Sequence, residues 1–248
     1  MSYKLWGFWG ARSESTHQCA ARLANMLVTL SAVHPAFTKW NQQGSSVAEA
    51  QAAFCEMPPK NDELTEIFDQ GRHYTDIGDK PMSQLGYDVS AWNGREDGYA
   101  LHFHINAGAY ARRRDTNSVF FQLPRLRDST QDLVNATTLK RVLLAVALPW
   151  EVDWAVIETW DYRGKRLDSE ERPLHPWAGW ITYLSQRYAR NITLPSTAIV
   201  ERIADGGLVM LATDQPFTVA NPAHVAALDA MQASLAPVQW SIAEGPRR

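Results

Sequence analysis

Hydrophobic and polar positions change their spacing several times along this chain of 248 residues. The run YKLWGFW at 3–9 is rich in aromatic and aliphatic side chains and predicts a β-strand. Apolar side chains then recur every three or four residues from Cys19 to Leu30, which predicts a helix capped by Ser13 or Ser15. The pattern therefore opens with a strand followed by a helix.

Helical spacing returns in four later stretches, each bounded by a residue that favours a helix start or end. We expect helices over Val47–Cys55, over Asn61–Gln70 closed by Gly71, from Asp128 or Ser129 to a stop at Pro149, and from an Asn221 cap with Pro222 in the first turn.

Strand patterns occupy the regions between these helices. YALHFHIN at 99–106 and SVFFQLP at 118–124 predict two strands, and WAVIETW at 154–160 predicts another. Asp205-Gly206-Gly207 joins two β-rich runs and predicts a tight hairpin, because glycine accepts a positive φ. Strands and helices alternate without βαβ regularity, and no linker divides the chain. The sequence thus predicts one α+β domain over residues 1–248, with a mainly antiparallel sheet packed against several helices.

Composition narrows the classes of function. The hydrophobic content of 45% suits a substantial core, and the net charge of −3 gives no general attraction for nucleic acid or for an anionic membrane. The longest apolar run, LLAVALPW at 143–150, is far shorter than a bilayer span, and the N-terminus lacks the pattern of a secretory signal. Cys19 and Cys55 make no disulfide framework. We therefore expect a cytoplasmic protein with no membrane or nucleic-acid partner.

Candidate chemistry is sparse. His102 and His104 alternate in a predicted strand and share one face of it, so they could form half of a metal or acid–base site or simply line a sheet face. A zinc site needs three or four ligands, and the remaining histidines are scattered singly. No phosphate loop, dinucleotide fingerprint or nucleophile elbow occurs. The sequence predicts no catalytic residue, no cofactor and no metal.

Charge, in contrast, is segregated. From Glu56 to Gly98 there are ten acidic and four basic residues, a net charge of −6, and the basic run Arg112–Arg114 follows. Its segment GDKPMSQLGYDVSAWNGRED at 78–97 has the character of a polar loop. This acidic stretch is either a solvated face or a surface that docks on a basic partner. Tryptophan is frequent, with ten copies. We expect Trp92, beside Asn93-Gly94, to lie in a loop and to be the exposed anchor. The candidate partner-binding residues are Glu63, Glu66, Asp69, Asp88, Trp92, Glu96 and Asp97.

Three segments carry a resemblance to a known family: LWGFWGARSESTHQCAARL, PWAGWITYLS, and IVERIADGGLVMLAT followed by PFTVANPAHVAALDAM. In this order they resemble the immunity proteins of bacterial polymorphic toxin systems, of the type called immunity protein 52. The resemblance implies an α+β protein that neutralises a restriction-endonuclease-like nuclease toxin, often a type VI secretion effector. The positions that match recurring motif residues, which we expect to be mainly architectural, are Trp9, Arg12, Glu14, Gly179, Trp180 and Tyr183.

This resemblance makes the shortage of catalytic motifs expected, because an inhibitor needs no catalytic set. A nuclease binds a polyanion and commonly presents a basic face, which an acidic surface can cover. Two other functions stay open: a small hydrolase that uses His102 and His104, and a non-catalytic adaptor for another bacterial protein.

Overall fold

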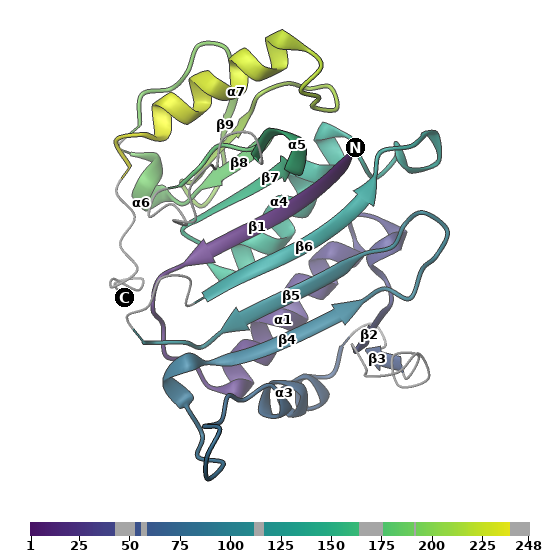
Figure 1. The fold of residues 1–248 in the computed structure, drawn as a ribbon, viewed down its shortest axis with the longest axis vertical. Coiled ribbons are helices and arrows are strands. Elements are labelled where there is room, and N and C mark those ends of the chain that lie inside the picture. The colour runs from purple at the N-terminus through teal and green to yellow at the C-terminus, as the bar shows by residue number, and fades with distance from the viewer. Residues whose placement is uncertain (43–52, 56–58, 112–116, 164–175, 191, 239–248) are drawn as a thin grey trace.

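The computed structural model describes residues 1–42, 53–55, 59–111, 117–163, 176–190 and 192–238. Within these ranges one antiparallel sheet of ten strands runs through the molecule, in the order β3-β2-β4-β5-β6-β1-β7-β8-β10-β9 (Figure 1). The predicted α+β class is therefore confirmed.

The strands are β1 Ser2–Trp9, β2 Trp40–Gln42, β3 Ala53–Cys55, β4 Tyr87–Trp92, β5 His102–Ala107, β6 Asn117–Arg125, β7 Trp154–Thr159, β8 Ile181–Leu184, β9 Ile199–Arg202 and β10 Leu208–Leu211. The α-helices are α1 Thr16–Ser31, α3 Asn61–Gln70, α4 Ala136–Trp150, α5 Trp160–Arg163, α6 Gln186–Ala189 and α7 Pro222–Leu235. Short 3₁₀ turns cover Pro35–Phe37, Ser83–Leu85 and Asp128–Thr130.

Two layers build most of the molecule. Helices α1 and α4 lie behind the sheet and α3 lies beside its β4 edge, whereas no helix of the described residues lies in front of strands β4, β5, β6 and β1 (Figure 1). Burial alternates along them, as it should in a sheet packed on one side only. Strands β7, β8 and β10 are buried at every position, and α7 lies at this end of the sheet. The sheet therefore has a one-sided part and a fully covered part.

Helix caps follow the predicted signals in most places. Ser15 caps α1 through a capping box, in which its hydroxyl accepts from the Gln18 amide at 3.2 Å. Asn221 accepts from the Ala223 amide at 3.0 Å, with Pro222 as the first residue of α7. Helix α3 has the predicted limits.

Helix α4 differs from its prediction at both ends. It begins after Asn135, whose side chain accepts from the Thr138 amide, while Asp128 lies in a separate 3₁₀ turn. Pro149 does not stop it but lies in the last turn. Glu151 ends the helix in the left-handed region at φ 47°.

Two further predictions need correction. Residues 53–55 form strand β3, although helical spacing had been assigned to Val47–Cys55; residues 47–52 lie outside the described residues. The stretch taken as a polar loop contains strand β4, which pairs with β5 from Tyr87 to Trp92.

The predicted hairpin is confirmed as β9–β10. Gly206 takes a φ of 82°, and the Gly207 amide donates to Asp205 Oδ1 at 2.7 Å. The Tyr183 hydroxyl donates to Asp205 Oδ2 at 2.9 Å, which ties the turn to strand β8. Of the helices in the described ranges, none combines the length and the apolar character needed to cross a bilayer.

Candidate functional site

Side chains on the helix-free face of β4, β5, β6 and β1 form a grid, which we call the open face. Cross-strand register places them in three rows of four. The rows are Asp88, Asn106, Ser118 and Phe8; Ser90, His104, Phe120 and Trp6; and Trp92, His102, Gln122 and Lys4.

Aromatic rings occupy the middle of the open face. Trp6 and Phe120 are partly exposed, and their ring centroids lie 4.5 Å apart. The His102 ring lies 6.3 Å from that of Phe120. Lys4 Nζ lies 5.9 Å from the Phe120 ring centroid and 4.8 Å from that of Trp160, which is 61% exposed. A cluster of this kind combines π surfaces with a single cation.

A polar network adjoins the cluster on the β4 side. Asp88 lies 3.3 Å from both His73 Nε2 and His104 Nε2, and the Asn106 amide donates to it at 2.9 Å. Burial on its own would raise the pKa of Asp88, but the hydrogen bonds from His104 and Asn106 and the charges of the two histidines outweigh it, so its pKa is lowered. The carboxylate is thus held in its charged form.

His104 also contacts a hydroxyl, since its Nδ1 lies 2.8 Å from Ser90 Oγ. Ser90, His104 and Asp88 therefore have the order of contacts of a hydrolytic triad. Acyl transfer further needs N–H donors aimed at the developing oxyanion. Backbone N–H groups of paired strands lie in the plane of the sheet and do not point above Ser90. The arrangement suits hydrogen bonding to a bound molecule better than acyl transfer.

The two histidines of β5 lie on the same side of the sheet. His102 and His104 project from the open face at neighbouring positions of β5. Burial lowers the pKa of His102, and the charge of His104 adds to this. Within the described ranges, no group of three or more His, Cys, Asp or Glu side chains is placed to hold a metal ion.

The structure separates the predicted partner-binding residues into three groups. Glu63, Glu66 and Asp69 are exposed on α3, which packs against α1 at the β4 edge of the helix layer. Part of their charge is neutralised locally, because Lys60 lies 2.9 Å from Glu63 and Arg72 lies 2.5 Å from Asp69.

The other predicted residues lie on or beside the open face. Asp88 and Trp92 project from it, while Glu96 and Asp97 are exposed in the loop between β4 and β5, where Arg95 pairs with Asp97. Trp92 is not a loop residue, as had been expected, but the half-buried last residue of β4. Arg112–Arg114 lie outside the described residues.

Two of the motif residues form an ion-pair network at the C-terminus of α4. Glu14, whose side chain is 5% exposed, lies 2.9 Å from Arg12 Nε and 2.6 Å from Arg22 Nε. Glu151 pairs with both arginines, and Arg12 Nη2 donates to the carbonyl of Trp150 at 3.0 Å. Burial lowers the pKa of Arg12, opposed by the adjacent Glu14. Cations at a helix C-terminus are favourable, so this network fastens the turn after β1 to α4.

The remaining motif residues are buried. Trp9 stacks on Trp150 with centroids 5.4 Å apart. Trp180 has no exposed surface and packs 5.1 Å from Tyr3. A Cβ on Gly179 would lie 2.4 Å from the carbonyl oxygen of Ile157, so this position accepts only glycine without a shift of the backbone.

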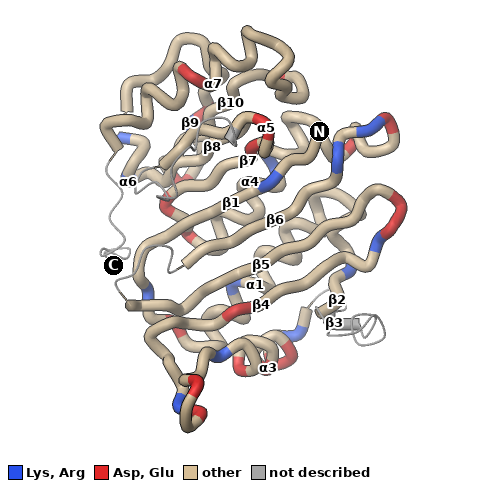
Figure 2. Tube along the Cα trace, viewed as in Figure 1, with Lys and Arg blue, Asp and Glu red and all other residues tan. Residues whose placement is uncertain are grey.

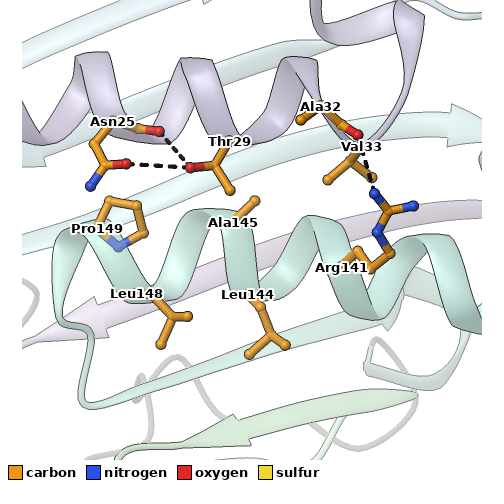
Figure 3. A pocket seen from close by; sticks show the side chains of 9 residues that line it. All are labelled: Asn25, Thr29, Ala32, Val33, Arg141, Leu144, Ala145, Leu148 and Pro149. Atoms are coloured by element: carbon orange, nitrogen blue, oxygen red, sulfur yellow. Dashed lines mark hydrogen bonds between the residues drawn. The ribbon is translucent and has the colours of Figure 1, made fainter. Parts of the chain in front are cut away.

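A hollow of about 520 Å³ lies on the opposite side of the molecule, between α1 and α4 (Figure 3). Its polar groups bond within the two helices and their ends: Thr29 Oγ1 donates to the Asn25 carbonyl at 2.8 Å, and Arg141 donates to the Ala32 carbonyl at 3.1 Å. The rest of the lining is largely aliphatic, from residues such as Val33, Leu144 and Leu148.

The structure thus has an exposed sheet face of aromatic and polar side chains, and a separate ion-pair network that joins the turn after β1 to α4. The family model for immunity protein 52 matches residues 2–238, so the chain belongs to that family. A Pseudomonas aeruginosa T6SS (type VI secretion system) protein, PA0821, has a similar fold, with a TM-score of 0.58 and 12% identity over 96% of this chain and 76% of that one. No protein of curated function matches the sequence.

Sequence reasoning did not identify the open face. Trp6 and Phe120 each alternate with buried neighbours along their strands. This alternation predicts the strands, but it does not show that the two rings meet on one exposed face. The register that places the two rings together comes from the pairing of β1 with β6, which are more than 100 residues apart in the chain.

Proposed function

We propose that this protein is an immunity protein that binds and neutralises a nuclease toxin delivered by type VI secretion. The family match over residues 2–238 carries the proposal, since the family implies binding of a cognate toxin protein. Two observations support the finer part: the similar fold of a T6SS protein, and the acidic residues on α3 and the β4–β5 loop. A nuclease commonly presents a basic substrate face, which these carboxylates complement.

An inhibitor that binds the toxin blocks it in a one-to-one ratio, whereas an enzyme could inactivate many toxin molecules. Co-expression of the chain with the toxin encoded beside its gene should restore growth. Titration of the purified toxin should then abolish nucleic-acid cleavage at one equivalent of this protein. Loss of toxin activity at a small fraction of an equivalent would instead establish a catalytic role, and failure to restore growth would reject the immunity function for that toxin.

The acidic residues can be tested by kinetics. Charge reversal of Glu63, Glu66 and Asp69 together should slow association with the toxin and weaken its salt dependence, because steering charges act mainly on the on-rate. Trp92→Ala should instead raise the off-rate. For a hot spot, the binding free energy should weaken by about 2 kcal/mol. Unchanged rates in both variants, with folding intact, would move the contact away from these residues.

A further inference from the structure

We propose that the toxin docks on the open face, with a basic part of its surface over β4 and an apolar contact over Trp6, Phe120 and Trp160. This inference rests on the proposed function and names the surface that performs it. The occupant is the cognate toxin, presenting a basic surface, and not a second copy of this chain.

The composition of the open face points to an interface. A sheet face left to water usually carries polar side chains, but here two large rings lie in contact at its centre, with a 61% exposed Trp160 beside them. Figure 2 shows strands β5, β6 and β1 with almost no charged residues, while charges gather at their ends. An apolar, charge-depleted centre with a polar rim is the usual anatomy of a protein–protein interface.

Charge decides the orientation of the occupant. On the β4 side the face carries Asp88, whose lowered pKa keeps it ionised, and the adjacent loop exposes Glu96. Helix α3 adds exposed carboxylates along the same edge (Figure 2). The described cation of the face, Lys4, lies at the other side, over Phe120 and Trp160. A basic surface placed over β4 therefore meets opposite charge.

The size of the face shows why the acidic rim must take part. Four strands spaced about 4.8 Å apart and six residues long cover roughly 400 Å². A standard interface needs about 800 Å² on each partner. The open face supplies about half of that area, so the contact must extend onto the rim, where the β4–β5 loop and α3 hold the exposed carboxylates.

The α1–α4 hollow is the competing surface. Val28 is 46% exposed on α1, near aliphatic lining residues, so this side also offers apolar area. Thr29 and Arg141 already donate to carbonyl groups of α1 and its C-cap, and the residues that line the hollow include no acidic side chain that would select a basic partner. The two faces lie on opposite sides of the sheet and can be tested separately.

The decisive experiment measures the affinity of the full chain for the adjacent-gene toxin carrying an inactivated catalytic residue. Phe120→Glu should weaken binding at least about 10-fold, because a charge is introduced into the apolar centre. Val28→Glu, the matched control on the other side, should stay within about twofold. Trp160→Ala should weaken binding in the same direction as Phe120→Glu, and its exposed position keeps the fold intact if Phe120→Glu proves unstable.

A second arm tests the orientation. Glu96→Lys should slow association at low salt, whereas Asp214→Lys, the same change at an exposed position between β10 and α7, should not. Wild-type affinity in Phe120→Glu and Trp160→Ala, or loss of binding in Val28→Glu alone, would overturn the proposal and leave the immunity function standing. A wild-type chain that neither binds nor protects would instead reject the proposed function itself.

Discussion

The sheet contains two parts that differ in what covers them. Strands β4, β5, β6 and β1 are packed on one side, while β7, β8 and β10 are buried at every position. Two tryptophans illustrate the difference: Trp180, before β8, has no exposed surface, whereas Trp160 is 61% exposed beside the open face. The covered part is built for stability, and the one-sided part leaves area for a partner.

The motif positions that carried the resemblance sit in the frame rather than on the open face. Gly179, Trp180 and Tyr183 lie in or beside β8, and Arg12 with Glu14 lies at the end of α4. The residues that identify the family are therefore a poor guide to the residues that touch the partner.

The largest expected effect lies in the covered part. Trp180→Ala removes a fully buried ring that packs on Tyr3 and donates to the Thr213 carbonyl at 2.9 Å. We expect the free energy of unfolding to fall by roughly 3–5 kcal/mol. Denaturant unfolding followed by tryptophan fluorescence measures this change. A soluble variant of normal stability that no longer binds the toxin would assign Trp180 to the interface instead.

A slightly smaller loss is expected at the ion-pair network. Glu14→Ala leaves Arg12 and Arg22 without their shared carboxylate, and Arg12 is 10% exposed. Removing one partner of a buried pair costs roughly 3 kcal/mol, at the lower end of the usual range because Glu151 still contacts both arginines.

Thermal unfolding measures this loss, with Glu63→Ala as the control variant. Glu63 pairs with Lys60 on the surface, so its removal breaks an exposed ion pair. Exposed pairs contribute less than about 1 kcal/mol. Equal stability losses in the two variants would show that the Glu14 network does not fasten α4.

Local patterns were sufficient for much of the fold. Helix α3, the Ser15 cap and the β9–β10 hairpin depend on residues close in sequence, so the sequence predicts them directly. Strand β4 was missed because glycine, proline and charged residues surround it, and its order comes from pairing with β5. The stop predicted at Pro149 is displaced by one residue, because the helix ends at Trp150 and Glu151 takes the left-handed conformation.

The candidate site was less accessible from sequence. Linear charge counting found the acidic stretch, but local pairs such as Arg72–Asp69 reduce its charge, and the chain places its members on different surfaces. The aromatic centre needs long-range register between β1 and β6, which no local pattern supplies. Trp92 was taken as a loop anchor because Asn93-Gly94 follows it, although the strand extends up to that turn.

In the one-sided part of the sheet, truncation of a large side chain should reduce stability less than it does in the covered part. Phe120→Ala removes a partly exposed ring, so we expect the free energy of unfolding to fall by about 1–2 kcal/mol, well below the value for Trp180→Ala. The same denaturant titration compares the two variants. A loss as large as that of Trp180→Ala would mean that the open face is a structural layer and would weaken its assignment to the toxin.

The smallest effect concerns pH, and it tests whether the polar network on β4 is held together by charge. Burial would raise the pKa of Asp88, but hydrogen bonds from His104 and Asn106 and the charges of His104 and His73 lower it below its ordinary value. A carboxyl group with a lowered folded pKa stabilises the fold above the unfolded pKa of about 3.8, and this contribution is lost as pH falls through the folded pKa.

Asp88→Asn should therefore lower the melting temperature slightly at pH 5–7, and the difference from wild type should shrink as pH falls below about 4. Melting curves of both proteins over this range measure the difference, with Asp214→Asn as a control for the loss of one exposed negative charge. A difference that stays constant or grows toward low pH would show that Asp88 acts through packing and not as a charge. Asp88 would then offer no anionic anchor for a basic toxin surface, and the orientation over β4 would depend on the rim carboxylates alone.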